Sequence, residues 1–169
     1  MNIGTINTEQ LDITTLQLNG SYFNFEAEFV EDNVRCIPMI ARYKLDACGI
    51  KLTLKQWSKM LVEERNIVAA TDCSTSEKLL NYKLQLIDII KRRTNEVAKE
   101  LVLDAVPEWM QLHKVPEAVT IQCNNIGITL TVQKWQQLPT LQRFALVKLC
   151  NSSHEQKNLP HALKEFGLV

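Results

Sequence analysis

The stretch Gly49-Ile50-Lys51-Leu52-Thr53 decides the fold of this chain, because it returns 78 positions later as Gly127-Ile128-Thr129-Leu130-Thr131. With the same offset Trp57 falls on Trp135, in a chain that has only 3 tryptophans. Self-similarity at a fixed offset indicates an internal repeat. We therefore predict two copies of one unit, at about residues 37–70 and 115–150. The other repeated positions pair Ile37-Pro38 with Val115-Pro116 and Arg65 with Arg143.

Each copy carries the signals of a helix-turn-helix. Pro38 and Pro116 suit the start of a helix, and Gly49 and Gly127 suit its left-handed end. A threonine follows at the position that caps a second helix, and a tryptophan four residues later completes a hydrophobic staple. Apolar residues recur at helical spacing at positions 41, 45 and 48, and again at 119, 123 and 126. The repeated residues are thus expected to serve folding.

The segments outside the two copies complete a mostly α-helical prediction. A long helix from Ser74 to about Arg93 joins the copies, and its apolar face is expected to be Leu79, Leu80, Leu84, Ile87 and Ile90. Residues 22–30 alternate apolar and polar side chains, which predicts a short N-terminal extended segment, either a strand or an arm packed on the helices. Residues 94–114 are expected to be irregular, with a helical piece around 97–103.

The length of 169 residues and the hydrophobic content of 46% allow a core that needs no disulfide or metal to hold it. We predict a single helical domain over residues 23–169, containing both repeats. Residues 1–22 are rich in Asn and Thr and are predicted to be a poorly ordered N-terminal segment. A polar loop at 151–158 leads to a last short helix over 160–166.

The charge balance bounds the possible partners. Lys and Arg number 19, Asp and Glu also number 19, and so the chain offers no uniform field to a polyphosphate backbone or an anionic membrane. The second helices of the two copies, near 54–60 and 132–138, carry few basic side chains for reading DNA. No apolar run approaches the roughly 20 residues of a membrane span, and no signal-peptide pattern is present. We expect a cytoplasmic protein that binds neither nucleic acid nor membrane.

The 5 cysteines are predicted to be free thiols, because none stands in a Cys-x-x-Cys pair. Metal and cluster sites usually bring ligands in close pairs, whereas the nearest cysteines, Cys36 and Cys48, are 12 positions apart. Cys48 and Cys123 align with apolar residues of the other copy, which favours the core. Cys36 and Cys150 lie at helix ends and are expected to be semi-exposed.

No sequence pattern for catalysis is present. The Gly-x-Ser-x-Gly nucleophile motif is absent, and the 5 glycines are scattered singly, which disfavours a phosphate-binding loop. We expect a protein that is not an enzyme and that has no bound cofactor.

The charged residues differ between the two copies, and this difference favours a partner surface on the first. Arg35, Arg42, Lys44 and Asp46 are predicted to form a charged face on its first helix. The second copy has the uncharged residues Thr120, Gln122 and Asn124 at the last three positions. Because the shared residues are explained by folding, function is better sought among residues that differ.

A second candidate for partner binding is His154-Glu155 in the polar loop before the last helix. Binding residues often lie in loops held by a rigid scaffold. The structural alternative is a solvated turn in which Ser152 or Ser153 caps the local backbone.

Three stretches carry a resemblance to a known family. They are Phe23-Asn24-Phe25-Glu26-Ala27-Glu28-Phe29, then Arg35 to Met39 with Arg42 and Lys44 to Leu52, and then Leu141 to Leu149 continuing through Ser153-His154-Glu155 to Ala162-Leu163-Lys164-Glu165-Phe166. Together they resemble the cyanobacterial nitrate reductase associated protein family, over about residues 23–169.

The resemblance implies a protein needed for an active assimilatory nitrate reductase, which is a molybdopterin and iron–sulfur enzyme that takes electrons from ferredoxin. It brings no catalytic residues. We therefore predict an accessory protein that matures or stabilises nitrate reductase, its partner, by protein–protein interaction. The alternative is a carrier of an iron–sulfur cluster or metal cofactor that uses Cys36 and Cys48.

Overall fold

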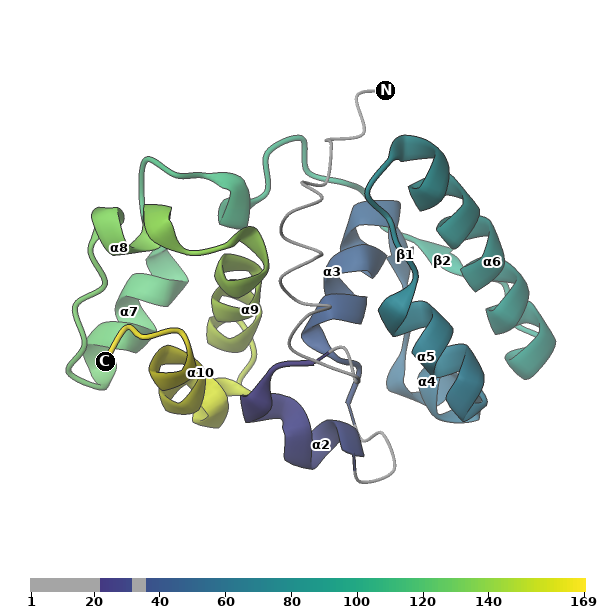
Figure 1. Ribbon diagram of the computed structural model, residues 1–169, viewed down its shortest axis with the longest axis horizontal. Helices are drawn as coiled ribbons and strands as arrows, with labels where there is room; N and C mark the ends of the chain where they lie inside the picture. Colours follow the sequence, from purple (N-terminus) through teal and green to yellow (C-terminus); the bar gives the residue numbers. More distant parts are fainter. Residues whose placement is uncertain (1–21, 32–35) are drawn as a thin grey trace. The chain divides into compact units, whose positions relative to one another are not determined.

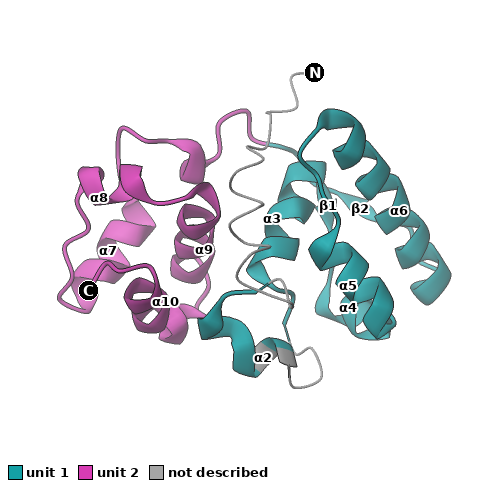
Figure 2. Ribbon diagram, viewed as in Figure 1, with its two compact units in different colours: residues 1–103 teal, residues 104–169 magenta. Residues whose placement is uncertain are grey.

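The computed structural model describes residues 22–31 and 36–169, which form a mostly helical protein with one small two-stranded sheet (Figure 1). The chain divides into two compact units, unit 1 up to Leu103 and unit 2 from Asp104 (Figure 2). The helical class is thus confirmed, while the single domain stays a prediction. Within the described ranges no helix is long and apolar enough to cross a membrane. The predicted N-terminal segment lies, apart from Tyr22, outside the described residues.

Unit 1 packs its long helix, α6, against three shorter helices, α3, α4 and α5. The hydroxyl of Tyr82 on α6 is buried and donates to the carbonyl of Val68 on α5 at 3.0 Å. The elements of unit 1 are η1 (Asn24–Glu26), α2 (Ala27–Glu31), α3 (Met39–Cys48), β1 (Ile50–Lys51), α4 (Leu54–Lys59), α5 (Val62–Ala70), α6 (Ser76–Thr94) and β2 (Lys99–Glu100).

The buried face of α6 differs from the predicted one. Leu80 and Leu84 are exposed, by 53% and 57%, although the sequence suggested that both are buried. The buried stripe of the helix is instead rotated by about one residue around the helix axis from the predicted stripe. The buried face is set by the contacts with α3, α4 and α5 and not by the positions of most leucines. The buried residues of α6 are Leu79, Tyr82, Leu86, Ile89 and Ile90.

Unit 2 is built around α9, a helix that is buried on almost every side. It contacts η2, α7 and α10. Continuous apolar residues such as Phe144 to Val147 are typical of a helix at the centre of a bundle. The elements of unit 2 are η2 (Glu108–Met110), α7 (Glu117–Asn125), α8 (Val132–Gln137), α9 (Thr140–Cys150), η3 (Gln156–Asn158) and α10 (Leu159–Glu165).

The helix signals predicted for the two copies are present in both units. Each first helix follows a proline. A left-handed glycine caps α3, with φ of 72° at Gly49, and in unit 2 Gly127, with φ of 75°, follows the cap residue Ile126 of α7. The side chain of Thr53 caps α4, and that of Thr131 caps α8. Both repeated tryptophans are buried. An exception is Ile126, which is exposed and not in the core. The duplication itself stays a prediction.

The predicted extended segment at residues 22–30 is wrong, because this stretch is helical. It forms η1 and α2. The carboxylate of the buried Glu26 accepts from the backbone N–H groups of Phe23, at 3.0 Å, and of Met39, at 2.8 Å. This carboxylate fixes a helical turn and ties it to the start of α3. Alternation of apolar residues over a few positions does not reveal such a contact, since its partner is 13 positions away.

The predicted helical piece at 97–103 is also wrong, because this stretch is extended. Asn95 takes a left-handed conformation, with φ of 58°, and ends α6. Strand β2 then pairs antiparallel with β1, and the N–H of Leu101 donates to the carbonyl of Gly49 at 2.9 Å. The pairing partner lies at the end of the first repeat helix, so the contact is not visible locally.

The two left-handed glycines provide a test of this arrangement. Alanine at either position is expected to cost about 1 kcal/mol for its left-handed backbone. At Gly49 the added methyl group would lie 3.4 Å from the carbonyl oxygen of Leu101, an ordinary van der Waals contact, and at Gly127 nothing lies within 4 Å. We therefore expect Gly49→Ala and Gly127→Ala each to lower the free energy of unfolding by about 1 kcal/mol. Urea denaturation measures both, and an unchanged stability in either variant would contradict the left-handed backbone at that glycine.

Candidate functional site

Lys44, one of the residues predicted to bind a partner, is buried and does not belong to a charged surface. Only 3% of it is exposed, and its ammonium group donates to the backbone carbonyl of Ala69 near the end of α5. The prediction placed Arg42, Lys44 and Asp46 on one face, but residues two apart point to nearly opposite sides of a helix. The structure therefore removes Lys44 from the predicted surface.

Burial changes the acid–base properties around Lys44. Desolvation lowers the pKa of its ammonium group from 10.5 to about 8, although nearby Cys73 and Asp72 act in the opposite direction. Burial likewise raises the pKa of the Cys73 thiol to about 11. The negative end of the α5 dipole, where the Ala69 carbonyl lies, favours a cation. Lys44 thus completes the C-terminal end of α5 from inside unit 1.

The remaining residues of the predicted charged face are less exposed than expected. Arg42 and Asp46 are half-buried, one helical turn apart on the same side of α3. A hydrogen bond joins the Arg42 guanidinium to the sulfur of Met39 at 3.7 Å. Arg35 lies outside the described residues. Of the predicted charged face, Arg42 and Asp46 are therefore the residues that the structure describes at the surface of unit 1.

The thiols do not form the predicted alternative metal site. Cys48 is buried at the end of α3, and half-buried Cys36 precedes the start of that helix. A helix of ten residues rises about 14 Å from one end to the other, too far for one ion or one cluster to join thiolates at its two ends. Burial also raises the pKa of Cys48 to about 12, which disfavours the thiolate that a metal requires. Over residues 22–31 and 36–169, no three His, Cys, Asp or Glu side chains form a group that could hold a metal.

The other thiols belong to the core, as predicted for Cys123. Cys150 was expected to be semi-exposed but is buried, because α9 is enclosed almost all round. Burial raises the pKa of Cys150 to about 12.

The second predicted site, the turn with His154 and Glu155, is partly as expected. His154 is exposed, whereas Glu155 is half-buried. The hydroxyl of Ser152 accepts from the N–H of Glu155 at 3.3 Å, which confirms the predicted capping role of a serine. The amide of Gln156 donates to the Cys150 carbonyl at 3.2 Å. The turn is therefore held by its own polar groups and presents the histidine to solvent.

This turn continues into a basic surface that the sequence prediction missed. Lys157, His161 and Lys164 are all exposed and are spaced four and three residues apart, so they share one side of the helical run from η3 into α10. We name them the α10 basic face. The signal was available, since Leu159, Ala162 and Leu163 alternate with them at helical spacing and are buried on the opposite side.

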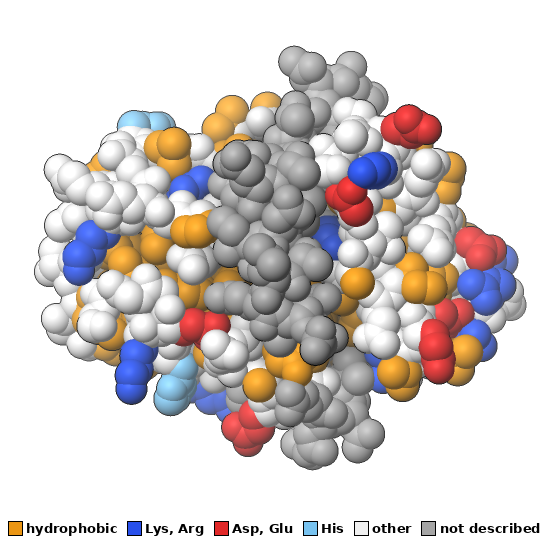
Figure 3. All heavy atoms as spheres, in the orientation of Figure 1, with side chains coloured by type: hydrophobic (Ala, Val, Ile, Leu, Met, Phe, Trp, Pro, Cys, Tyr) orange, Lys and Arg blue, Asp and Glu red, His pale blue; other side chains and the backbone are white. Residues whose placement is uncertain are grey.

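Unit 2 differs from unit 1 in the chemistry of its surface. All 3 histidines of the chain lie in unit 2. In the view of Figure 3, basic and histidine side chains recur along the edge of unit 2, whereas acidic and basic side chains lie beside one another on unit 1. The exposed positive charges of the α10 basic face favour contact with acidic groups.

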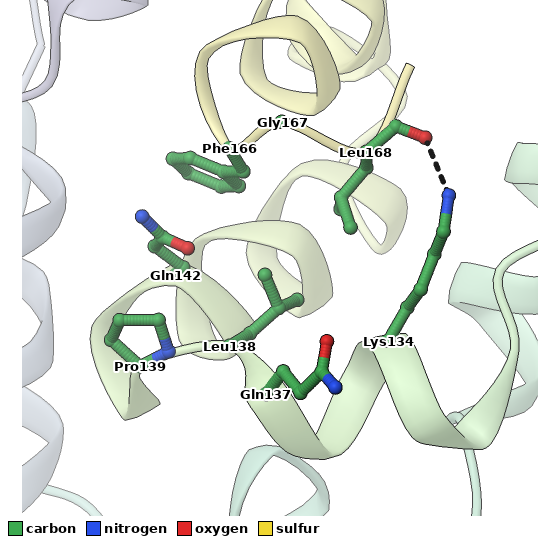
Figure 4. A pocket seen from close by; sticks show the side chains of 8 residues that line it. All are labelled: Lys134, Gln137, Leu138, Pro139, Gln142, Phe166, Gly167 and Leu168. Carbon is green, nitrogen blue, oxygen red and sulfur yellow. Dashed lines mark hydrogen bonds between the residues drawn. The ribbon is translucent and has the colours of Figure 1, made fainter.

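Unit 2 also contains a pocket of about 300 Å³ between the α8–α9 turn and the chain that follows α10 (Figure 4). Lys134 forms one side, and its ammonium group donates to the Leu168 carbonyl at 3.3 Å. Gln142 and the ring of Phe166 lie on the other side. The remaining lining residues are Gln137, Leu138, Pro139, Gly167 and Leu168.

Comparison with known proteins shows the family of the chain. The model of the conserved nitrate reductase-associated protein family matches residues 22–166. The chain belongs to this family. No curated protein and no solved structure was found to match it. The resemblance found in the sequence is therefore confirmed at the level of the family.

The family match spans both units of this nitrate reductase-associated family member. It includes the buried Lys44, the turn with His154 and the whole α10 basic face. Of the pocket lining, Gly167 and Leu168 lie beyond the matched residues.

Proposed function

We propose that the chain is a non-enzymatic accessory protein that matures or stabilises assimilatory nitrate reductase by binding to it. The observation that carries the proposal is the match to the nitrate reductase-associated family over residues 22–166. The difference in burial between the reactive groups and the basic surface also supports the proposal. The buried Lys44 and the buried thiols are enclosed in their units, whereas the α10 basic face is open to solvent.

We assign the contact with the reductase chiefly to the α10 basic face together with His154. These four side chains are exposed on one short segment. The buried side of α10 fixes the segment on unit 2, so little backbone ordering is needed on binding. Positive charges at the rim of an interface act mainly on the association rate and weaken with added salt. Arg42 and Asp46 form a second contact in this proposal.

Charge reversal tests the proposed surface. The double variant Lys157→Glu/Lys164→Glu is expected to weaken capture of nitrate reductase by at least about tenfold, because two attractive contacts become repulsive. The measurement is a pull-down from nitrate-grown cells with the tagged full chain, with the reductase quantified at several salt concentrations.

The matched control is Lys59→Glu/Lys91→Glu in unit 1. These lysines are also exposed, and like Lys164 they lie in the last turn of a helix. The control should capture the reductase as well as wild type does. Equal loss in both double variants would contradict the surface assignment, and no capture by the wild-type chain would contradict the proposed function.

A further inference from the structure

The two aligned turns between helices are covered differently in the two units. In unit 1 the end of α6 and the residues just after it contact both α4 and α5. The amide of Gln56, in the first turn of α4, donates to the carboxylate of Glu96 at 2.8 Å. The carboxylate of Glu64, in the first turn of α5, accepts from Arg93 at 2.8 Å. Gln56 and Glu64 are therefore contacted by a segment of the chain itself.

In unit 2 the aligned turn carries the pocket instead. With the offset of 78, Gln56 corresponds to Lys134 and Glu64 to Gln142. Both Lys134 and Gln142 line the pocket. After α9 the chain continues into α10, which is much shorter than α6. The residues that follow α10 close one side of the pocket, where the Leu168 carbonyl accepts from Lys134, while about 300 Å³ stays open.

We propose that this pocket takes an acidic side chain of a partner protein, with a neighbouring apolar residue placed against Phe166 and Leu138. Unit 1 supplies the template, since its aligned position is occupied by Glu96 followed by Val97. Lys134 offers a cation where unit 1 offers an amide, and a charge-assisted hydrogen bond to a carboxylate is the stronger of the two. This proposal rests on the proposed function in so far as the partner is the reductase.

The neutral Gln142 also favours an acid over a base. In unit 1 the aligned Glu64 is buried and holds two arginines, Arg92 at 3.3 Å and Arg93 at 2.8 Å. Replacement of this carboxylate by an amide removes the site for a guanidinium and leaves donors and an acceptor for a peptide backbone. The size of the pocket is at the lower end for ligand sites, which suits one or two residues.

A peptide titration tests this proposal without the reductase. The probe is acetyl-Asn-Glu-Val-amide, which copies Asn95 to Val97, and the control peptide is acetyl-Asn-Gln-Val-amide. Backbone NMR spectra of the full chain should shift at Lys134, Gln142 and Leu168 with the acidic peptide. The uncharged peptide should bind at least about tenfold more weakly.

Variants of Lys134 complete the test. Lys134→Glu should abolish the shifts and Lys134→Arg should retain them, while Lys114→Glu, outside the pocket, should bind as wild type does. Unchanged urea midpoints show that each variant is folded. Equal shifts with both peptides, shifts elsewhere in unit 2, or none at all would overturn the proposal. Because the reductase is not used, this outcome is independent of the pull-down.

Discussion

Replacing Lys44 with methionine is expected to raise the free energy of unfolding by about 2 kcal/mol at pH 7. Burial lowers the pKa of Lys44 from 10.5 to about 8, so the charged form costs roughly 3 kcal/mol in the folded state. Loss of the hydrogen bond to the Ala69 carbonyl lowers the free energy of unfolding by about 1 kcal/mol and so offsets part of this stabilisation. Methionine retains most of the aliphatic stem. Urea denaturation at pH 7 measures the difference.

The pH dependence identifies the charge as the cause. Below pH 8 the lysine is protonated in both states and the full cost applies. Between pH 8 and 10.5 the folded state binds fewer protons than the unfolded state, so this lysine adds stability as pH rises. The advantage of Lys44→Met should therefore shrink by roughly 3 kcal/mol between pH 8 and 10.5.

The buried thiols act in the opposite direction, and most of their effect is common to the two proteins. Burial raises the pKa of Cys73 to about 11 and that of Cys48 to about 12, so unfolded thiols ionise first above pH 9 and stability is lost there. Wild type and Lys44→Met share these thiols, and loss of Lys44 removes only its lowering effect on the pKa of Cys73. A difference between them that does not change from pH 7 to 10.5 would contradict an ionised, buried Lys44.

Replacing Arg143 with alanine is expected to lower the free energy of unfolding by roughly 4 kcal/mol. Arg143 is 6% exposed and donates to three acceptors in unit 2. Its truncation leaves these acceptors without the donor and removes the side chain that ties η2 to α9. The acceptors are the carbonyls of Trp109, at 2.8 Å, and Leu138, and the hydroxyl of Thr140, at 3.0 Å.

The aligned residue Arg65 provides the matched control. It is half-buried and donates to the carbonyls of Trp57 and Ser58 at 3.1 and 2.9 Å, both within the α4–α5 region. Arg65→Ala is expected to cost only about 1 kcal/mol, since water replaces the lost donor. Both arginines lie 6.0 Å from the ring of the repeated tryptophan, so the cation–π contact does not separate them. Equal losses in thermal or urea unfolding would contradict this difference.

Local signals predicted most of the helices, whereas contacts between distant segments did not follow from the sequence. The glycine at position 49 and the threonine at 53 act on neighbouring backbone, so their effect is readable from spacing. The helical turn at Glu26 and the strand β2 each depend on a partner far along the chain. Periodicity identified α6 as a helix but placed exposed Leu80 in its core, because two helical faces carry leucines.

The candidate site was predicted in part for the same reason. His154 lies in a polar turn, and its exposure follows from composition. The burial of Lys44 depends on a carbonyl 25 residues away, which no local pattern reveals. The α10 basic face was not predicted, although the helical spacing of Lys157, His161 and Lys164 is present in the sequence.

The most direct test of the accessory role is nitrate reductase itself, measured in cells with and without this chain. Reductase activity, protein level and molybdenum content should be compared after growth on nitrate. We expect activity to be lost without the chain, with low reductase protein if the role is stabilisation, or normal protein lacking molybdenum if it is maturation. The wild-type chain should restore activity and Lys157→Glu/Lys164→Glu should not. Full reductase activity in cells that lack the chain would contradict the account.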